Sequence, residues 1–69
     1  MSAMVTVVLD TGMLEADALF EIDNTADDGP LLTIVRWAVE GVPMPKGVMP
    51  SVLYHELADL ALEEYRAVL

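Results

Sequence analysis

Apolar and acidic residues alternate along residues 14–23, and this pattern constrains the fold more than any other feature of the chain. The same segment contains several good helix formers, so a helix is the competing interpretation. A helix would scatter the acidic side chains around its circumference, whereas a strand separates them onto one face. Only Leu19 departs from the alternation. We therefore predict a strand whose apolar face holds Leu14, Ala16, Ala18, Phe20 and Ile22 and whose acidic face holds Glu15, Asp17, Glu21 and Asp23.

The segments on either side also favour strands. Residues 4–9 are rich in β-branched side chains and end at Asp10-Thr11-Gly12, where Gly12 can take positive φ, so the first two strands should form a hairpin. Residues 31–40 predict a third strand that is apolar on much of both faces. Strict alternation assigns its two faces as Leu31, Thr33, Val35, Trp37 and Val39 against Leu32, Ile34, Arg36, Ala38 and Glu40.

The remaining residues predict a connector and a helix. Residues 41–50 hold three prolines and two glycines, which exclude a long helix or a central strand and indicate a stiff connector. Residues 51–69 form the clearest helix, with Ser51 or Pro50 at its start. The chain is thus expected to be one α+β domain over residues 1–69. It should contain a three-stranded antiparallel sheet, in the order β-β-β-α, with one C-terminal amphipathic helix packed on it.

The predicted helix has more apolar circumference than one sheet can cover. Its polar residues share an arc of roughly 100°, and apolar residues fill about 200°, where a single buried face needs little more than 100°. We expect the surplus to meet a second subunit or a partner. The candidate interface residues are Leu53, Leu60, Leu62 and Leu69.

The chain is acidic and apolar at the same time. It carries 12 acidic residues against three basic ones, for a net charge of −9, and 55% of its residues are hydrophobic. Such a charge repels nucleic acids and anionic membranes and attracts basic protein surfaces. A domain of this size buries only about 60% of its unfolded surface, so self-association as a homodimer is expected to add stability. The apolar runs are too short to span a bilayer and no signal peptide is indicated, so we expect a cytoplasmic protein.

No pattern in the chain predicts catalysis, a metal or a cofactor. The absence of cysteine excludes disulfides and thiol chemistry. Asp10-Thr11-Gly12 resembles the signature of aspartic proteases, among which retroviral enzymes supply one Asp per subunit of a dimer. The glycine-rich flap and the later hydrophobic-Gly-Arg segment of that family are missing, and three-residue matches are common, so we interpret the motif as a turn.

Two further candidates also favour non-catalytic interpretations. A calcium loop that begins at Asp23 would need glycine at its sixth position and glutamate at its twelfth, but these are Asp28 and Ile34. His55 has no suitable nucleophile to activate, because the only serines lie at the N-terminus and at the start of the predicted helix. We therefore expect a protein that is not an enzyme.

The layout of the chain resembles that of small acidic accessory proteins of bacteriophages and prophages. The resemblance is carried by residues 5–22, by residues 32–41 with the Glu40-Gly41-Val42 turn, and by the helical sequence of residues 57–64. It implies an inhibitor or modulator that acts by occupying a surface of a host protein in the host cytoplasm.

We accordingly expect a non-catalytic module that binds a basic surface of another protein, with nucleic-acid mimicry as the sharper form of this hypothesis. The alternative is a structural or assembly protein that forms a stable homo-oligomer. The residues expected to contact the partner are Glu15, Asp17, Glu21, Asp23, Asp27 and Asp28.

Overall fold

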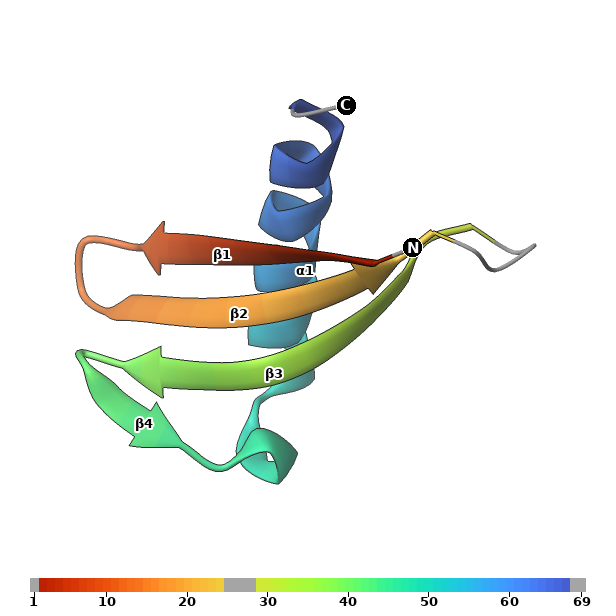
Figure 1. Ribbon diagram of the computed structural model, residues 1–69. Helices are drawn as coiled ribbons and strands as arrows, with labels where there is room; N and C mark the ends of the chain where they lie inside the picture. The colour runs from red at the N-terminus through yellow and green to blue at the C-terminus, as the bar shows by residue number, and fades with distance from the viewer. Residues whose placement is uncertain (1, 25–28, 68–69) are drawn as a thin grey trace.

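The chain forms one antiparallel sheet with a single long helix behind it (Figure 1). A computed structural model describes residues 2–24 and 29–67. Within these ranges the fold is α+β, and the strand order in the sheet follows the sequence order. The elements are β1 (Ser2–Asp10), β2 (Glu15–Asp23), β3 (Leu31–Val39), β4 (Val42–Met44), a short 3-10 helix η1 (Lys46–Val48) and α1 (Ser51–Ala67).

Strands β1 and β2 form the predicted hairpin. Their register is regular from Ser2 opposite Asp23 to Asp10 opposite Glu15. The turn is closed by a 3.0 Å hydrogen bond from the N–H of Thr11 to the carbonyl of Leu14. The alternation in β2 is confirmed as a strand pattern, because four of the five residues assigned to its apolar face are buried, whereas Leu14 precedes the strand and is 40% exposed. The buried set is Ala16, Ala18, Phe20 and Ile22, the last two with no exposed surface.

Strand β3 contains a bulge that corrects the predicted assignment of its faces. The pairing with β2 steps from Leu19 opposite Arg36 to Phe20 opposite Ile34, which leaves Val35 as an extra residue. A bulge places two residues of one strand opposite a single residue of its partner, so the alternation of faces slips by one. Ile34 therefore packs against the core together with Trp37, and Val35 and Arg36 are both exposed.

The prediction of three strands was wrong by one, because part of the connector forms β4. This strand pairs with the end of β3, with Met44 opposite Trp37. It lies at the sheet edge, where proline is tolerated because no neighbouring strand needs its missing N–H. A tight turn joins the two strands, with positive φ of 52° at Glu40 and 80° at Gly41. Positive φ at both central residues is typical of the type I′ turn that short hairpins favour.

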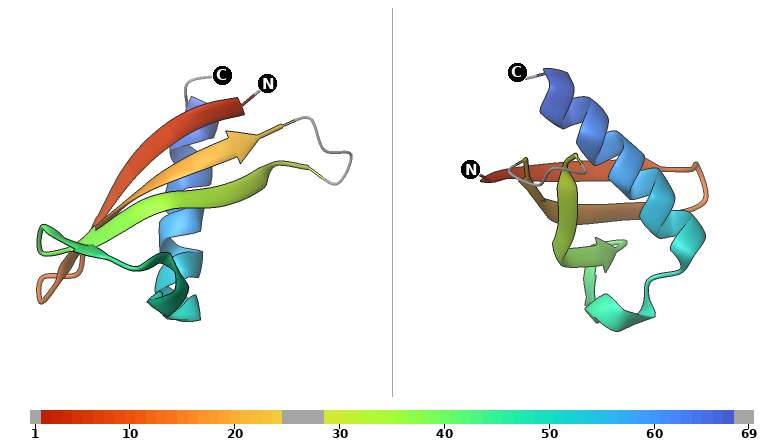
Figure 2. Two further views of the ribbon diagram at one scale, coloured as in Figure 1. Left: turned by 60° about the horizontal axis from the view of Figure 1, so that its bottom comes forward. Right: turned by 90° about the vertical axis from the view of Figure 1, so that its right-hand side faces the viewer.

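Helix α1 crosses the sheet steeply and packs mainly on β1 (Figures 1 and 2). Its buried residues are Leu57 and Ala61, and Tyr54 meets the ring of Phe20 edge-on at 6.0 Å between centroids. The core thus lies between α1 and one face of the sheet, centred on Phe20, Ile22 and Leu57. Over residues 2–24 and 29–67 there is no helix with the length and apolar character needed to cross a membrane.

Candidate functional site

The face of the sheet turned away from α1 is covered by no other element that the structure describes (Figure 2). We call it the outer face. Because side chains alternate along each strand, the residues next to the buried ones point to this side. The outer face comprises Met4, Thr6 and Val8 of β1, Glu15, Asp17, Leu19, Glu21 and Asp23 of β2, Leu31, Thr33, Val35, Arg36 and Ala38 of β3, and Pro43 of β4.

Large apolar side chains lie exposed on the outer face. The exposed fractions are 56% for Met4, 55% for Val8, 59% for Leu31 and 38% for Val35. Single exposed apolar residues are common, but several on one sheet face form the kind of surface that proteins use for contacts. The outer face is therefore the strongest candidate for a binding surface in the described part of the chain.

Carboxylates run along the middle of the outer face. Asp17 lies between Val8 of β1 and Ala38 of β3, and Glu21 lies between Met4 and Thr33. Glu15 and Asp17 are two positions apart, as are Glu21 and Asp23, which on a strand is about 6–7 Å, whereas Asp17 and Glu21 are four positions apart, about 13 Å. The arrangement is an acidic line along β2 that Leu19 interrupts, with the apolar Met4, Val8 and Ala38 among the residues beside it.

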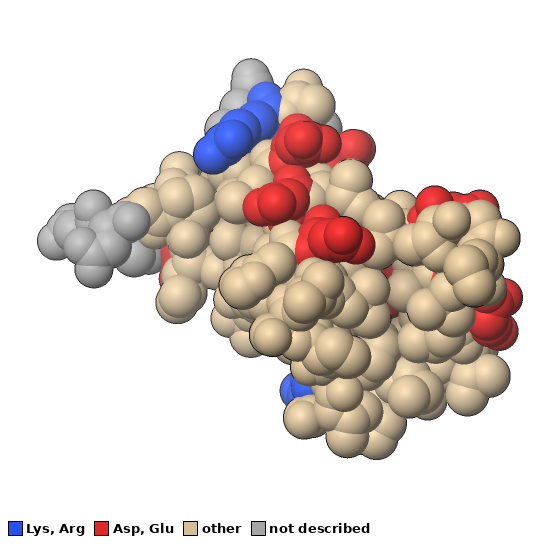
Figure 3. Space-filling model, turned by 180° about the vertical axis from the view of Figure 1, so that it is seen from behind, with Lys and Arg blue, Asp and Glu red and all other residues tan. Residues whose placement is uncertain are grey.

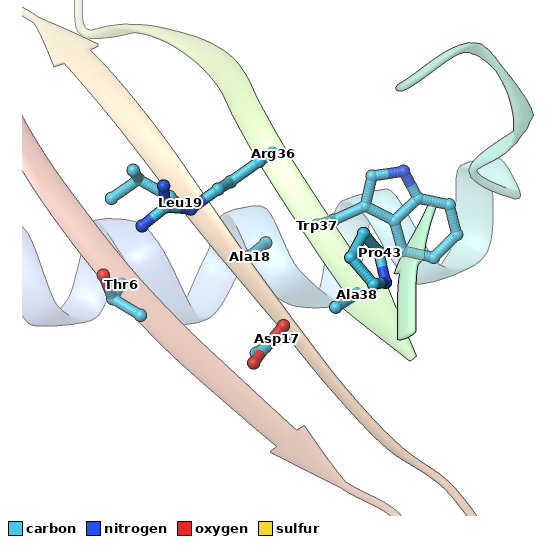
Figure 4. A pocket seen from close by; sticks show the side chains of 8 residues that line it. All are labelled: Thr6, Asp17, Ala18, Leu19, Arg36, Trp37, Ala38 and Pro43. Atoms are coloured by element: carbon cyan, nitrogen blue, oxygen red, sulfur yellow. The ribbon is translucent and has the colours of Figure 1, made fainter. Parts of the chain in front are cut away.

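A shallow hollow of ≈ 260 Å³ opens on the outer face near its centre (Figure 4). The side chain of Arg36 extends across β2 beside Leu19, and Asp17 stands farther along β2. Small-molecule sites commonly occupy about 300–1,000 Å³, so a hollow of this size better fits one side chain of a protein partner. The guanidinium and the carboxylate give it both signs of charge.

The predicted partner-binding residues divide into two groups. Glu15, Asp17, Glu21 and Asp23 all belong to β2 and share the outer face, as the alternation predicted. Asp27 and Asp28 lie outside the described residues. The first group is therefore the part of the predicted site that the fold brings together.

The predicted oligomer interface lies on the helix and is less exposed than the outer face. Leu53 and Leu60 pack against the core, and Leu62 is half-buried. Leu69 lies outside the described residues. Oligomerisation through these residues stays a prediction.

Sequence reasoning missed the apolar part of the outer face. The signal was present in β1, where Met4 and Val8 alternate with the buried Val5 and Val7, so that both faces are apolar. A strand apolar on both faces either lies between two layers or exposes one of them. In this fold α1 covers one face only.

The Asp10-Thr11-Gly12 motif forms a turn. The Asp10 carboxylate accepts a 2.9 Å hydrogen bond from the N–H of Gly12, whose φ is 86°. The Thr11 hydroxyl accepts one from the N–H of Leu14 at 3.2 Å. These local bonds are typical of Asx and ST turns and account for each residue of the motif.

Other polar residues are distributed over the helix and the sheet ends. Figure 3 shows acidic side chains gathered on the exposed side of α1, which carries Glu56, Asp59 and Glu63. His55 is exposed next to them and meets the Tyr54 ring edge-on at 6.0 Å. Among the described residues there is no cluster of three or more side chains suited to hold a metal ion.

The chain matches no protein-family model, no curated protein and no solved structure.

Proposed function

We propose that this protein is a non-catalytic binding module that attaches its outer face to a basic surface of another protein. The observation that carries the proposal is the combination of exposed Met4, Val8 and Leu31 with the acidic line along β2. Apolar contacts supply affinity, and the carboxylates attract the partner and orient it.

The charge of the outer face favours a basic partner over a second copy of the chain. Its acidic residues outnumber Arg36, which is the only basic residue among them. Two copies meeting through this face would oppose like charges, which costs free energy when water is excluded. A surface rich in lysine and arginine would pair with the carboxylates instead.

The resemblance in layout to phage accessory proteins supports a more specific form of the proposal. In that form the chain occupies a functional surface of a host protein and inhibits or modulates it. The acids spaced along β2, two on each side of Leu19, suit mimicry of a nucleic-acid backbone, and the flanking apolar residues would add contacts that a phosphate backbone lacks.

The test uses two charge-reversal variants with the same change in net charge. Asp17→Lys with Glu21→Lys alters the outer face, and Glu56→Lys with Asp59→Lys alters the exposed side of α1. Each tagged protein is used to capture partners from its source cell. We expect one stoichiometric basic partner with the unaltered protein and the helix variant, and at least a tenfold lower yield with the outer-face variant.

Two results would count against this function. One is that no protein co-purifies in stoichiometric amount. The other is that both variants retain the partner equally. Salt provides an independent check, because a complex steered by exposed charges weakens as ionic strength rises.

A homo-oligomeric structural protein is the second candidate, and the exposed apolar residues of the outer face favour it. An oligomer held by apolar contacts persists or grows at high ionic strength, where repulsion between acidic subunits is screened. Light scattering on the purified chain at low and high salt separates the two proposals. A monomer at high protein concentration in both conditions rejects this candidate.

A further inference from the structure

Strand β1 is a long edge strand without the features that usually prevent an edge from pairing with another chain. It pairs with β2 on one side and forms one edge of the sheet. Edge strands commonly avoid unwanted pairing by being short or by carrying proline, inward charges or a bulge. The opposite edge, β4, has three residues and contains Pro43. β1 has nine residues and a regular register, and its only charged residue is Asp10 at its end.

The direction of the main-chain groups in β2 follows from its contacts with β3. The N–H of Glu15 donates to Oε1 of Glu40 at 2.9 Å, and its carbonyl accepts from the N–H of Glu40 at 2.8 Å. Both groups of Glu15 thus point away from β1. Main-chain groups alternate in direction along an antiparallel strand, so those of Ala16 point toward β1 and bond to its partner Leu9.

The same alternation determines which groups of β1 face the open side. Because Leu9, Val7 and Val5 bond to β2, the N–H and carbonyl groups of Met4, Thr6 and Val8 point away from the sheet. Within residues 2–24 and 29–67, no other element supplies hydrogen-bond partners to these groups. The edge therefore presents a row of free donors and acceptors at every second residue.

A hollow of ≈ 320 Å³ lies along this edge. Thr6 and Val8 point to the outer face and Val7 to the core, so a hollow that all three line lies beside the strand and not on one face. The C-terminal part of α1, which extends past β1 in Figure 1, provides the other wall. The helix residues that line the hollow are Leu60, Glu63 and Glu64.

We propose that an extended segment of a basic partner protein pairs with β1 and continues the sheet. The inference rests on the proposed function and specifies how that partner is recognised. Main-chain hydrogen bonds to Met4, Thr6 and Val8 hold the added strand, as in other cases of strand addition. The new strand widens the outer face, so one recognition surface uses both the side chains and the main chain of these residues.

The two walls of the hollow define the side chains of the added strand. Residues that point to the outer face lie beside Met4 and Val8 and should be apolar or β-branched. Residues that point toward α1 should be lysine or arginine, with their stems on Leu60 and their charges near Glu63 and Glu64. A second copy of β1 would bring its own Glu63 and Glu64 against the same pair, so like charges disfavour it.

The direct test is amide hydrogen exchange in the full chain with a synthetic peptide of alternating lysine and valine. In the free protein the amides of Met4, Thr6 and Val8 should exchange fast, and those of Val5 and Val7 slowly. With saturating peptide, exchange at the first three should slow at least tenfold, and the other two should change little. A peptide of alternating glutamate and valine serves as the control and should not bind.

A matched pair of variants at the centre of the edge tests the main-chain contact. Thr6→Pro removes an N–H that points away from β2, and Thr6→Val keeps it. We expect Thr6→Pro to weaken the Kd of the lysine–valine peptide about tenfold or more, and Thr6→Val to change it less than about twofold. Circular dichroism establishes that both variants fold.

A second pair tests the acidic wall of the hollow. Glu63→Gln with Glu64→Gln should weaken peptide binding about tenfold at low salt and reduce its dependence on salt. Glu56→Gln with Asp59→Asn removes the same charge from the same helix away from the hollow and should have a much smaller effect.

Four results would overturn the inference. The first is that the lysine–valine peptide does not bind at concentrations up to millimolar, and the second is that it binds but leaves the amides of Met4, Thr6 and Val8 unprotected. The third is that Thr6→Pro and Thr6→Val bind the peptide equally well. The fourth is that the free chain forms a dimer that Thr6→Pro dissociates. The last result would assign the edge to a second copy. If the captured partner is lost by the outer-face variant but kept by Thr6→Pro, the proposed function stands and strand addition does not.

Discussion

The indole Nε1 of Trp37 donates a 2.8 Å hydrogen bond to the carbonyl oxygen of Pro45. Trp37 lies in β3 with 4% of its surface exposed, and Pro45 follows β4. The bond joins the connector between β4 and α1 to a buried side chain of the sheet. It also satisfies the polar atom of a buried aromatic side chain, which would otherwise cost free energy.

Trp37→Phe should lower the free energy of unfolding by about 2 kcal/mol, because it removes buried ring atoms and leaves the Pro45 carbonyl without its donor. Urea unfolding followed by circular dichroism measures the loss. Pro45→Ala keeps the carbonyl acceptor and should cost less than about 1 kcal/mol. Equal losses in the two variants would show that the hydrogen bond contributes little.

Leu57→Ala should leave the chain largely unfolded at room temperature. Leu57 is fully buried between α1 and the sheet, and truncation of such a residue costs about 2–5 kcal/mol, comparable to the whole stability of a domain this small. Val52→Ala on the same helix should change stability by less than about 0.5 kcal/mol, because Val52 is 72% exposed. Thermal unfolding of the two variants checks the contrast.

Gly41→Ala should destabilise the protein by about 1–2 kcal/mol, and Gly47→Ala should be neutral or slightly stabilising. Both sites have open space for a methyl group, but Gly41 has φ of 80° whereas Gly47 does not have positive φ. The difference isolates backbone strain from steric contact. Denaturant unfolding of both variants gives the two values, and equal effects would contradict the conformation of the β3–β4 turn.

The bulge in β3 is tested by placing lysine at two neighbouring positions. Ile34→Lys should cost about 2 kcal/mol or more, because Ile34 packs against the core. Val35→Lys should cost less than about 1 kcal/mol, because the bulge turns this residue outward. Strict alternation predicts the opposite ranking, so unfolding midpoints of the two variants decide between the two registers.

The sequence predicted those elements that depend on local side-chain pattern. The alternation around Phe20 identified β2 as a strand and assigned Glu15, Asp17, Glu21 and Asp23 to one face. The Asp10-Thr11-Gly12 segment predicted the hairpin turn. The repeat of apolar residues, every two residues in a strand or every 3.6 in a helix, can be recognised within one segment, because it depends only on which residues of that segment are apolar.

The pairing of one strand with another could not be predicted from the side-chain pattern of a single segment. Val35 has the side chain of a core strand residue, and only the register between β2 and β3 makes it the extra residue of a bulge. Residues 42–44 become a strand because the end of β3 offers an edge, although Pro43 argues locally for a connector. Both outcomes depend on hydrogen bonds to residues that are distant in the sequence.

Composition and side-chain periodicity were enough to predict an acidic, apolar α+β domain with an amphipathic strand and a C-terminal helix. The location of the exposed apolar surface depends on how the helix packs on the sheet. A single helix covers one face of the sheet and packs mainly on β1, so Met4 and Val8 remain in solvent while Leu53 and Leu60 pack against the core. Burial depends on which surfaces meet, and the alternating pattern of one segment does not specify its neighbours.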